Sequence, residues 1–209
     1  MARVVEVNAD PPEMPRQRRS QAERRASTRA ALVAAGRALF AERGYADAGQ
    51  EEIVERAGVT RGALSHHFGT KHGLFRAVVE SVEQDLTARI ADAAMQGDNP
   101  MEHLRFGCLA FLDAALDPAV RRIVLLDAPA VLGWQAWREM ETVYGLGLVS
   151  EALEHCMEAG LLPRRPVQPL AHLLLAALNE AAMLVANAEE PERARRDVGQ
   201  EVERLLVSL

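Results

Sequence analysis

The residues best placed for chemistry in this sequence of 209 residues lie between Thr60 and Lys71, and their types suit recognition of double-stranded DNA. Arg61 can bond bidentately to guanine, Gly62 lets the backbone approach a base pair, and the methyl group of Ala63 can meet that of thymine. Other side chains of this stretch are placed to donate to phosphate oxygens, namely Thr60, Ser65, His66 and Lys71. Lys71 is the only lysine in the chain and begins a predicted helix, whose N-terminus favours an anion.

These side chains require two short helices that meet at a tight turn. We expect helices over about 50–57 and 61–68, because Gly58 can adopt a positive φ and Thr60 can cap the second helix. An apolar set supports this corner, consisting of Ile53, Ala57, Val59, Leu64 and Phe68. The pattern predicts a helix-turn-helix, which reads DNA by placing its second helix in the major groove.

Two other interpretations of this segment stay open. A helical corner around a glycine can be simple packing, because the pattern alone is only moderately predictive of function. A metal site is the second alternative, built on His66, His67 and His72. Adjacent histidines project in different directions from a helix, and no carboxylate or thiol lies beside them at ligand spacing. We therefore expect no metal and no other cofactor.

The charge distribution favours a DNA-binding front. The whole chain carries a formal net charge of −6, which by itself argues against a nucleic-acid partner. Residues 1–76, however, hold 13 basic and 9 acidic side chains, a net +4, whereas residues 77–209 hold 11 and 21, a net −10. We expect residues 1–20 to form a flexible basic arm, and the acidic part to bind something other than phosphate.

The composition is typical of a soluble globular protein. The chain is 26% charged, and its longest apolar stretch, 173–178, is far shorter than the ~20 residues that cross a bilayer. The first 15 residues lack the apolar run of a secretory signal. Cys108 and Cys156 lie in no C-x-x-C pair. We expect a cytoplasmic protein without membrane contact.

Periodicity predicts an all-α fold of about nine helices. Apolar residues recur at helical spacing, no window alternates as a strand does, and Pro or Gly marks each break. Besides the two helices of the corner, the expected helices run from residue 21 to Gly44, over 71–97 and 101–116, briefly after Pro118, and over 134–159, 169–187 and 191–206. We expect a three-helix DNA-binding domain over 21–80 and a larger helical domain for ligand sensing and dimerisation over 81–209.

Residues 25–80 resemble the DNA-binding domain of the TetR family of bacterial regulators. Three segments carry the likeness, namely 39–45 (LFAERGY), 53–64 and 67–71 (HFGTK). The resemblance implies DNA contacts from Thr28 and Arg29, from the stretch 60–67, which includes His67, and from Lys71.

The sequence departs from the family pattern at two places. Gly49 and Gln50 stand where the family usually has a hydroxyl residue followed by an aliphatic one, and Ser65 replaces a tyrosine. Loss of the hydroxyl removes a helix cap worth about 1 kcal/mol, and Gln50 becomes a candidate to reach a base or a phosphate instead.

The helix over 169–187 is apolar on nearly all sides, which indicates a partner subunit on one of them. The helix over 191–206 carries an apolar stripe and is the expected second interface element. The resemblance implies a homodimer closed by a four-helix bundle of these two helices; the alternative is that 169–187 is only a core helix. Two recognition helices about 34–36 Å apart would read a palindrome.

Large, adaptable side chains of the acidic half are candidates for a small-molecule pocket. Trp134 and Trp137 lead this group, because a spacing of three places them on one face of a helix. The candidates are Phe111, Trp134, Trp137, Met140, Tyr144, Asn179 and Met183. The alternative for most of them is a place in the core.

These features predict a ligand-responsive repressor, which binds a palindromic operator as a homodimer and is released by an unidentified small molecule. The alternative is a structural, nucleoid-type DNA-binding protein of the same fold that recruits a protein partner. An enzyme is not expected. Two dyads can be named, Cys108 with His155 and Cys156 with His172, but no glycine-rich loop, nucleophile elbow or metal spacing accompanies them.

Overall fold

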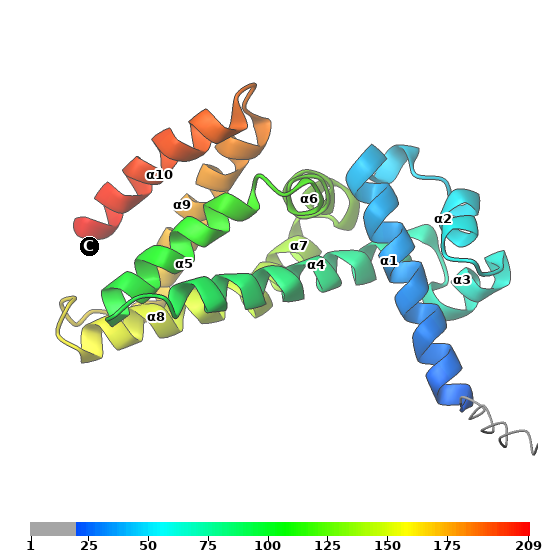
Figure 1. Cartoon of the computed structure of the whole chain (residues 1–209). Coiled ribbons are helices and arrows are strands. Elements are labelled where there is room, and N and C mark those ends of the chain that lie inside the picture. The colour runs from blue at the N-terminus through cyan, green and yellow to red at the C-terminus, as the bar shows by residue number, and fades with distance from the viewer. Residues whose placement is uncertain (1–19) are drawn as a thin grey trace, which may run out of the picture.

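A computed structural model describes residues 20–209, and every regular element in this range is helical (Figure 1). The expected arm lies outside the described residues apart from Ser20. The helices are α1 (Gln21–Asp47), α2 (Gln50–Arg56), α3 (Arg61–Phe68), α4 (Lys71–Ala94), α5 (Pro100–Ala114), α6 (Ala128–Leu132), α7 (Trp134–Glu141), α8 (Gly147–Glu158), α9 (Val167–Asn187) and α10 (Pro191–Val207), with π-helical segments η1 (Val120–Asp127) and η2 (Thr142–Leu146). Because η1 continues into α6, and α7 continues through η2 into α8, residues 20–209 form nine continuous helices. The predicted all-α class and helix number are confirmed.

The first helix begins and ends where its local sequence dictates. Ser20 and Glu23 form a reciprocal capping box at its start, in which the Ser20 hydroxyl accepts from the Glu23 N–H at 3.2 Å. Gly44, with φ +79°, interrupts the helix as expected, but one further helical stretch follows to Asp47. Leu32, Leu39 and Phe40 on its inner face are fully buried, so α1 forms the base on which the helical corner sits.

The long helix α4 runs from the corner into the larger helical domain (Figure 1). Leu74, Phe75 and Val78 in its first half are fully buried beside α1, and its second half packs along α5. The predicted domain boundary near residue 80 therefore falls inside a continuous helix. The helix ends at Ala94 rather than Gly97, and Asn99 then caps α5 by accepting from two backbone N–H groups at 3.1 Å.

Helices α5, α8, α9 and α10 form the core of the larger domain. Their inward residues, including Leu112, Leu153 and Ala182, are fully buried. The helix expected over 134–159 is continuous but contains the wider turns of η2. By length and composition alone α9 is apolar enough to cross a membrane. Its inner face packs against α5, α8, α10 and η1, as that of a core helix does.

Candidate nucleic-acid interface and ligand cavity

The corner between α2 and α3 has the geometry expected from its sequence. Gly58 adopts φ +65°, and the Thr60 hydroxyl accepts from the N–H of Ala63 at 3.3 Å. Leu64 is only 2% exposed and anchors α3 on the core of this unit. The cap and the buried leucine fix the helix axis, so the remaining side chains of α3 are held in defined directions.

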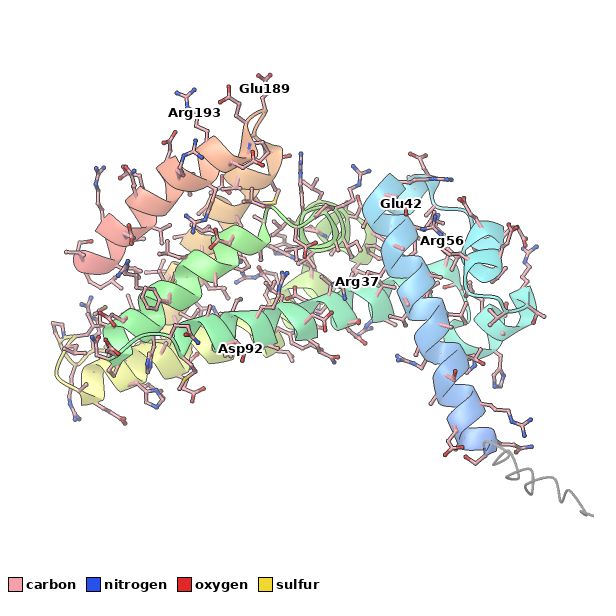
Figure 2. The ribbon with its side chains drawn as sticks, in the orientation of Figure 1. Arg37, Glu42, Arg56, Asp92, Glu189 and Arg193 are labelled. Carbon is pink, nitrogen blue, oxygen red and sulfur yellow. The ribbon has the colours of Figure 1, made fainter. Side chains whose placement is uncertain are left out.

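Ion pairs hold α2 against α1. Arg56 makes a two-pronged contact with Glu42 at 2.8 and 3.1 Å, and Figure 2 labels both side chains. Arg43 bonds to Glu52 at 2.7 Å. Gly49, at the N-cap of α2, offers no side-chain cap. Instead, the acidic side chains of Glu51 and Glu52 in the first turn interact favourably with the positive end of the helix dipole. The departure from the family pattern at Gly49 is thus balanced within the same turn.

The described structure gathers most predicted DNA-contacting residues on α3 and its flanks. Of the α3 candidates and their cap, Thr60, Arg61, Gly62, Ser65 and His66 are exposed, and Ala63 and His67 are half-buried. On α1, the Arg29 guanidinium lies 5.3 Å from the centre of the Phe68 ring, at the end of α3, and Thr28 is half-buried. Gln50 starts α2 and is half-buried. Their contacts with DNA stay a prediction.

Arg61 has a partner that sequence reasoning missed. Its guanidinium pairs with the Glu51 carboxylate at 2.8 Å, and both side chains are about 70% exposed. An exposed pair of this kind contributes at most about 1 kcal/mol, so DNA can displace the carboxylate. The acidic first turn of α2 could have indicated this pair, because a helix-turn-helix brings α2 close to α3.

Lys71 is tied to the protein in this structure. Its ammonium donates to the carbonyl oxygen of Ala46 at 3.3 Å and lies 4.5 Å from the centre of the Tyr45 ring. Burial lowers the pKa of Lys71. The side chain thereby joins the start of α4 to the end of α1, and a phosphate contact would require it to turn outward.

The end of α3 lies in a positive environment. Burial lowers the pKa of His67, and the nearby His66, Arg25 and Arg29 lower it further. The lowered pKa favours the neutral imidazole, which can form hydrogen bonds without adding charge beside the two guanidinium groups. In the described part of the chain, His, Cys, Asp and Glu residues form no group of three that can hold a metal ion.

Polar contacts connect this unit to the larger domain. The N–H of Tyr45 donates to Asp127 at 2.7 Å, and Arg122 lies 3.5 Å from the same carboxylate. The His72 ring lies 3.2 Å from the carbonyl oxygen of Val131. The end of α1 and the start of α4 therefore both contact the segment formed by η1 and α6.

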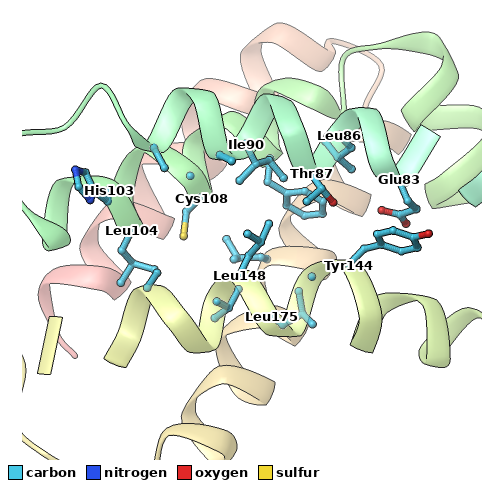
Figure 3. A pocket seen from close by; sticks show the side chains of 18 residues that line it. Glu83, Leu86, Thr87, Ile90, His103, Leu104, Cys108, Tyr144, Leu148 and Leu175 are labelled. Atoms are coloured by element: carbon cyan, nitrogen blue, oxygen red, sulfur yellow. The ribbon is translucent and has the colours of Figure 1, made fainter. Parts of the chain in front are cut away.

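A cavity of about 120 Å³ lies in the larger domain between α4, α5, η2, α8 and α9 (Figure 3). Of the seven predicted ligand-binding residues, Phe111 and Tyr144 line it. The five others do not. Trp134 is 68% exposed on the outside of the domain, and its ring centre lies 5.0 Å from that of Trp137, which is half-buried against the core.

The three remaining candidates also lie outside the cavity wall. Met140 is buried in the core, Met183 is half-buried, and the Asn179 amide donates to Glu141. Their role in ligand binding stays untested. A spacing of three residues placed the tryptophans on one face, but the packing of other helices decides which face meets a cavity.

The most unusual cavity residue, Glu83, was missed by sequence reasoning. Its side chain borders the cavity while the residue is only 8% exposed. Burial, together with the nearby Glu141, raises the pKa of this carboxyl to about 7. No motif marks Glu83, but an acidic residue between Val82 and Leu86 on the apolar face of a helix was a usable signal.

The two cysteines are not poised as nucleophiles. Burial raises the pKa of Cys108 to about 12 and raises that of Cys156 as well. A catalytic thiol needs the opposite shift, because the thiolate is the reactive form.

Two family models match the chain. One, described as bacterial regulatory proteins of the tetR family, matches residues 32–78. The other, described as a tetracyclin repressor-like C-terminal domain, matches residues 101–209, which is more than half of the chain. The first covers most of α1, the corner and the start of α4, and the second covers the larger helical domain.

Individual proteins agree with these matches. A solved TetR-family transcriptional regulator from Pectobacterium atrosepticum is 34% identical with a TM-score of 0.79, over 90% of this chain and 96% of that one. The transcriptional regulator CymR of Pseudomonas putida is 35% identical over 55% of this chain and 59% of its own length. The transcriptional activator FasR of Mycolicibacterium smegmatis is 34% identical over 41% and 39%. The chain spans about half the length of the curated relatives it matches.

Proposed function

Because the chain belongs to the TetR family of bacterial transcriptional regulators, we propose that it is a ligand-responsive repressor, which binds a palindromic operator as a homodimer and releases it when a small molecule binds. It would act in the cytoplasm, where the chromosome is accessible. Its relatives are regulators rather than enzymes, and the high pKa values of the buried thiols agree with a non-catalytic role.

The placement of α4 is the observation that carries the proposal. Leu74 and Phe75, near its start, belong to the core beneath α3, whereas Glu83, Leu86 and Ile90 border the cavity. A helix of this length spans about 36 Å and moves as one body. A molecule that shifts the cavity wall therefore shifts the base of the recognition helix, and changes the distance between the two recognition helices of a dimer.

We propose that α9 and α10 form the dimer interface. Leu173, Leu184 and Leu205 are 71%, 55% and 40% exposed, although they are large and apolar. A shallow groove between the two helices is lined in part by Leu184, Val198 and Leu205. A strip of exposed apolar side chains on neighbouring helices is typical of a subunit interface. This strip explains why α9 is apolar on nearly all sides.

Light scattering after size-exclusion chromatography tests the dimer. The wild-type chain of 22.9 kDa should elute at twice this mass, and the double variant Leu173→Glu, Leu184→Glu should be monomeric. Met95→Glu is a matched control, since Met95 is 70% exposed but lies at the end of α4. A monomeric wild type at micromolar concentration would refute this interface.

Electrophoretic shifts test the regulatory function. We expect the protein to prefer DNA from upstream of its own gene over a random duplex at about 0.15 M salt, and the affinity to fall steeply as salt increases. Equal binding to both duplexes would contradict operator recognition. A compound screen for release of the bound operator separates a ligand-responsive repressor from a protein that recruits a partner, because the latter would keep its DNA.

A further inference from the structure

Glu83 is a largely buried residue whose carboxyl borders one end of the cavity and has no hydrogen-bond or ion-pair partner among the described residues. Figure 3 draws Glu83 and Tyr144 at one end and His103 at the opposite end. Among residues 20–209 no hydrogen bond or ion pair to the Glu83 carboxyl is found, although the residue is only 8% exposed. Burial of such a group without compensation is costly, so its position calls for a ligand rather than a packing role.

The neighbouring buried carboxyl, that of Glu141, already has polar partners within the protein. Glu141 is also 8% exposed, but it pairs with Arg138 at 2.9 Å and accepts from the amide of Asn179. With both carboxyls ionised, these two glutamates and the arginine sum to one negative charge. One additional positive charge beside Glu83 would neutralise the group.

The cavity lining favours a cation over an anion. Among the described residues, no lysine or arginine lines it, His103 lies at its far end, and its other walls are mainly apolar, with Leu86, Ile90 and Leu175 among them. The rings of Phe111 and Tyr144 also line the cavity. Aromatic faces attract cations, whereas a carboxylate ligand beside Glu83 would meet its negative charge at the end of the cavity opposite His103.

The cavity volume limits the size of the ligand. A cavity of about 150 Å³ in another protein holds benzene, and this one measures about 120 Å³. A single ring or a short branched chain is therefore the appropriate scale, unless the walls move.

We propose that the effector of this regulator is a small apolar amine, about one ring in size, whose protonated nitrogen binds the Glu83 carboxylate beside the Tyr144 ring. The proposal rests on the ligand-responsive function proposed above and specifies its ligand class. The apolar part of the molecule would fill the space between α4, α5 and α8. Because burial raises the pKa of Glu83 to about 7, a bound ammonium would also drive a proton from the carboxyl into solvent.

Isothermal titration of the full chain with size-matched probes tests the proposal. We expect benzylamine to bind about tenfold more tightly than benzyl alcohol, because a charge-assisted bond is about twice as strong as a neutral one. Benzoate should bind most weakly. At pH 7 benzylamine binding should release about half a proton, measured in buffers of different ionisation enthalpy.

Two variants assign the effect to Glu83. Glu83→Gln should remove the preference for benzylamine over benzyl alcohol and the proton release. Asp92→Asn removes the same charge from the solvent side of α4 and should change neither (Figure 2). The proposal is overturned if benzylamine does not bind at millimolar concentration, if the alcohol or benzoate binds as tightly, or if Glu83→Gln keeps the preference.

The operator shift distinguishes this proposal from the regulatory one. Glu83-dependent amine binding without release of operator DNA would uphold the ligand class and refute the ligand-responsive function. Release by a neutral or acidic compound, with no effect of amines, would uphold the function and refute the ligand class.

Discussion

The backbone N–H of Tyr45, just after the break in α1, donates to the carboxylate of Asp127 over 2.7 Å. Asp127 ends η1, so this bond joins the DNA-binding unit to the domain that contains the cavity. The two residues are 82 positions apart, and the bond is partly buried. It is one of the few polar contacts through which the larger domain can fix the orientation of the helical corner.

Asp127→Ala should lower the free energy of unfolding by about 1–3 kcal/mol, because the partly buried Tyr45 N–H loses its acceptor. Asp127→Asn should recover part of the loss, since its amide oxygen can still accept. Urea denaturation measures both, and Asp92→Ala, at an exposed position, should cost no more than about 0.5 kcal/mol. If Asp127→Ala lowered the free energy of unfolding no more than Asp92→Ala, the contact between Tyr45 and Asp127 would not stabilise the protein.

Gly44→Ala should be more destabilising than Gly133→Ala. The two glycines share a backbone region that side chains avoid, with φ and ψ of 79° and 171° at Gly44 and 84° and 155° at Gly133. The strain costs about 1–3 kcal/mol at either site. A Cβ at Gly133 meets open space, whereas one at Gly44 would overlap the Arg122 guanidinium. Equal shifts in denaturation midpoint would show that Arg122 moves aside freely.

Glu51→Gln should strengthen operator binding by about two- to fivefold at low salt, and binding to a random duplex by less. The substitution frees Arg61 from its exposed ion pair, whose strength is at most about 1 kcal/mol. Glu55→Gln on the same helix is the control, because it removes an exposed charge that does not pair with Arg61. Fluorescence anisotropy with operator and random duplexes measures the effect. The same gain from both variants would mean that net charge, and not release of Arg61, is responsible.

Arg61→Ala should weaken operator binding by about 1–3 kcal/mol and relax the preference at one base pair. Lys71→Ala should weaken binding to all sequences alike, and reduce the slope of log affinity against log salt by about one. Competition binding with single-base operator variants separates the two. An unchanged preference in Arg61→Ala would remove Arg61 from direct base recognition.

Glu83 should make the stability of the wild type depend on pH. The folded pKa is raised from 4.5 to about 7, so the folded state holds more protons than the unfolded state between these values. Stability therefore falls as pH rises through this window and levels off above it. Of the described residues, Glu141 of α7, which is paired with Arg138, and Tyr144 of η2 lie near Glu83.

The Glu83→Gln variant isolates this contribution. Its stability relative to wild type should increase by about 3 kcal/mol from pH 4.5 to pH 7.5. Asp92→Asn should show no comparable trend. A flat difference between Glu83→Gln and wild type across this range would place the folded pKa of Glu83 near its ordinary value.

Local features of the sequence predicted the helical corner well. Gly58 and Thr60 act within three residues of their own positions, so their turn and cap can be derived without any distant partner. The same holds for Ser20, which caps α1. Gly49 was correctly expected to lack a cap, and only the compensating acidic turn was overlooked. The expected end of α4 was three residues too late, because the chain leaves the helix after Ala94 and turns before Asn99 caps α5.

The cavity shows where sequence reasoning ended. Phe111 and Tyr144 were predicted to line a pocket and do line the cavity, but Trp134 and Trp137 lie outside it. Periodicity assigns a residue to a face of its own helix, and cannot say which neighbouring helix covers that face. Glu83 was missed for the same reason, since the burial and the partners of a carboxylate on a helix depend on which other helices pack around it.

The sequence by itself determined the all-α class, the helix-turn-helix and the asymmetry of charge, because hydrogen bonds and side-chain spacing within one helix or turn decide these. Only the tertiary structure decided that Glu51 holds Arg61, that Asp127 binds Tyr45, and that Glu83 lies unpaired beside a cavity. Each of these depends on how rigid helices pack against one another. Packing sets burial, and burial sets the free-energy cost of an unpaired polar group.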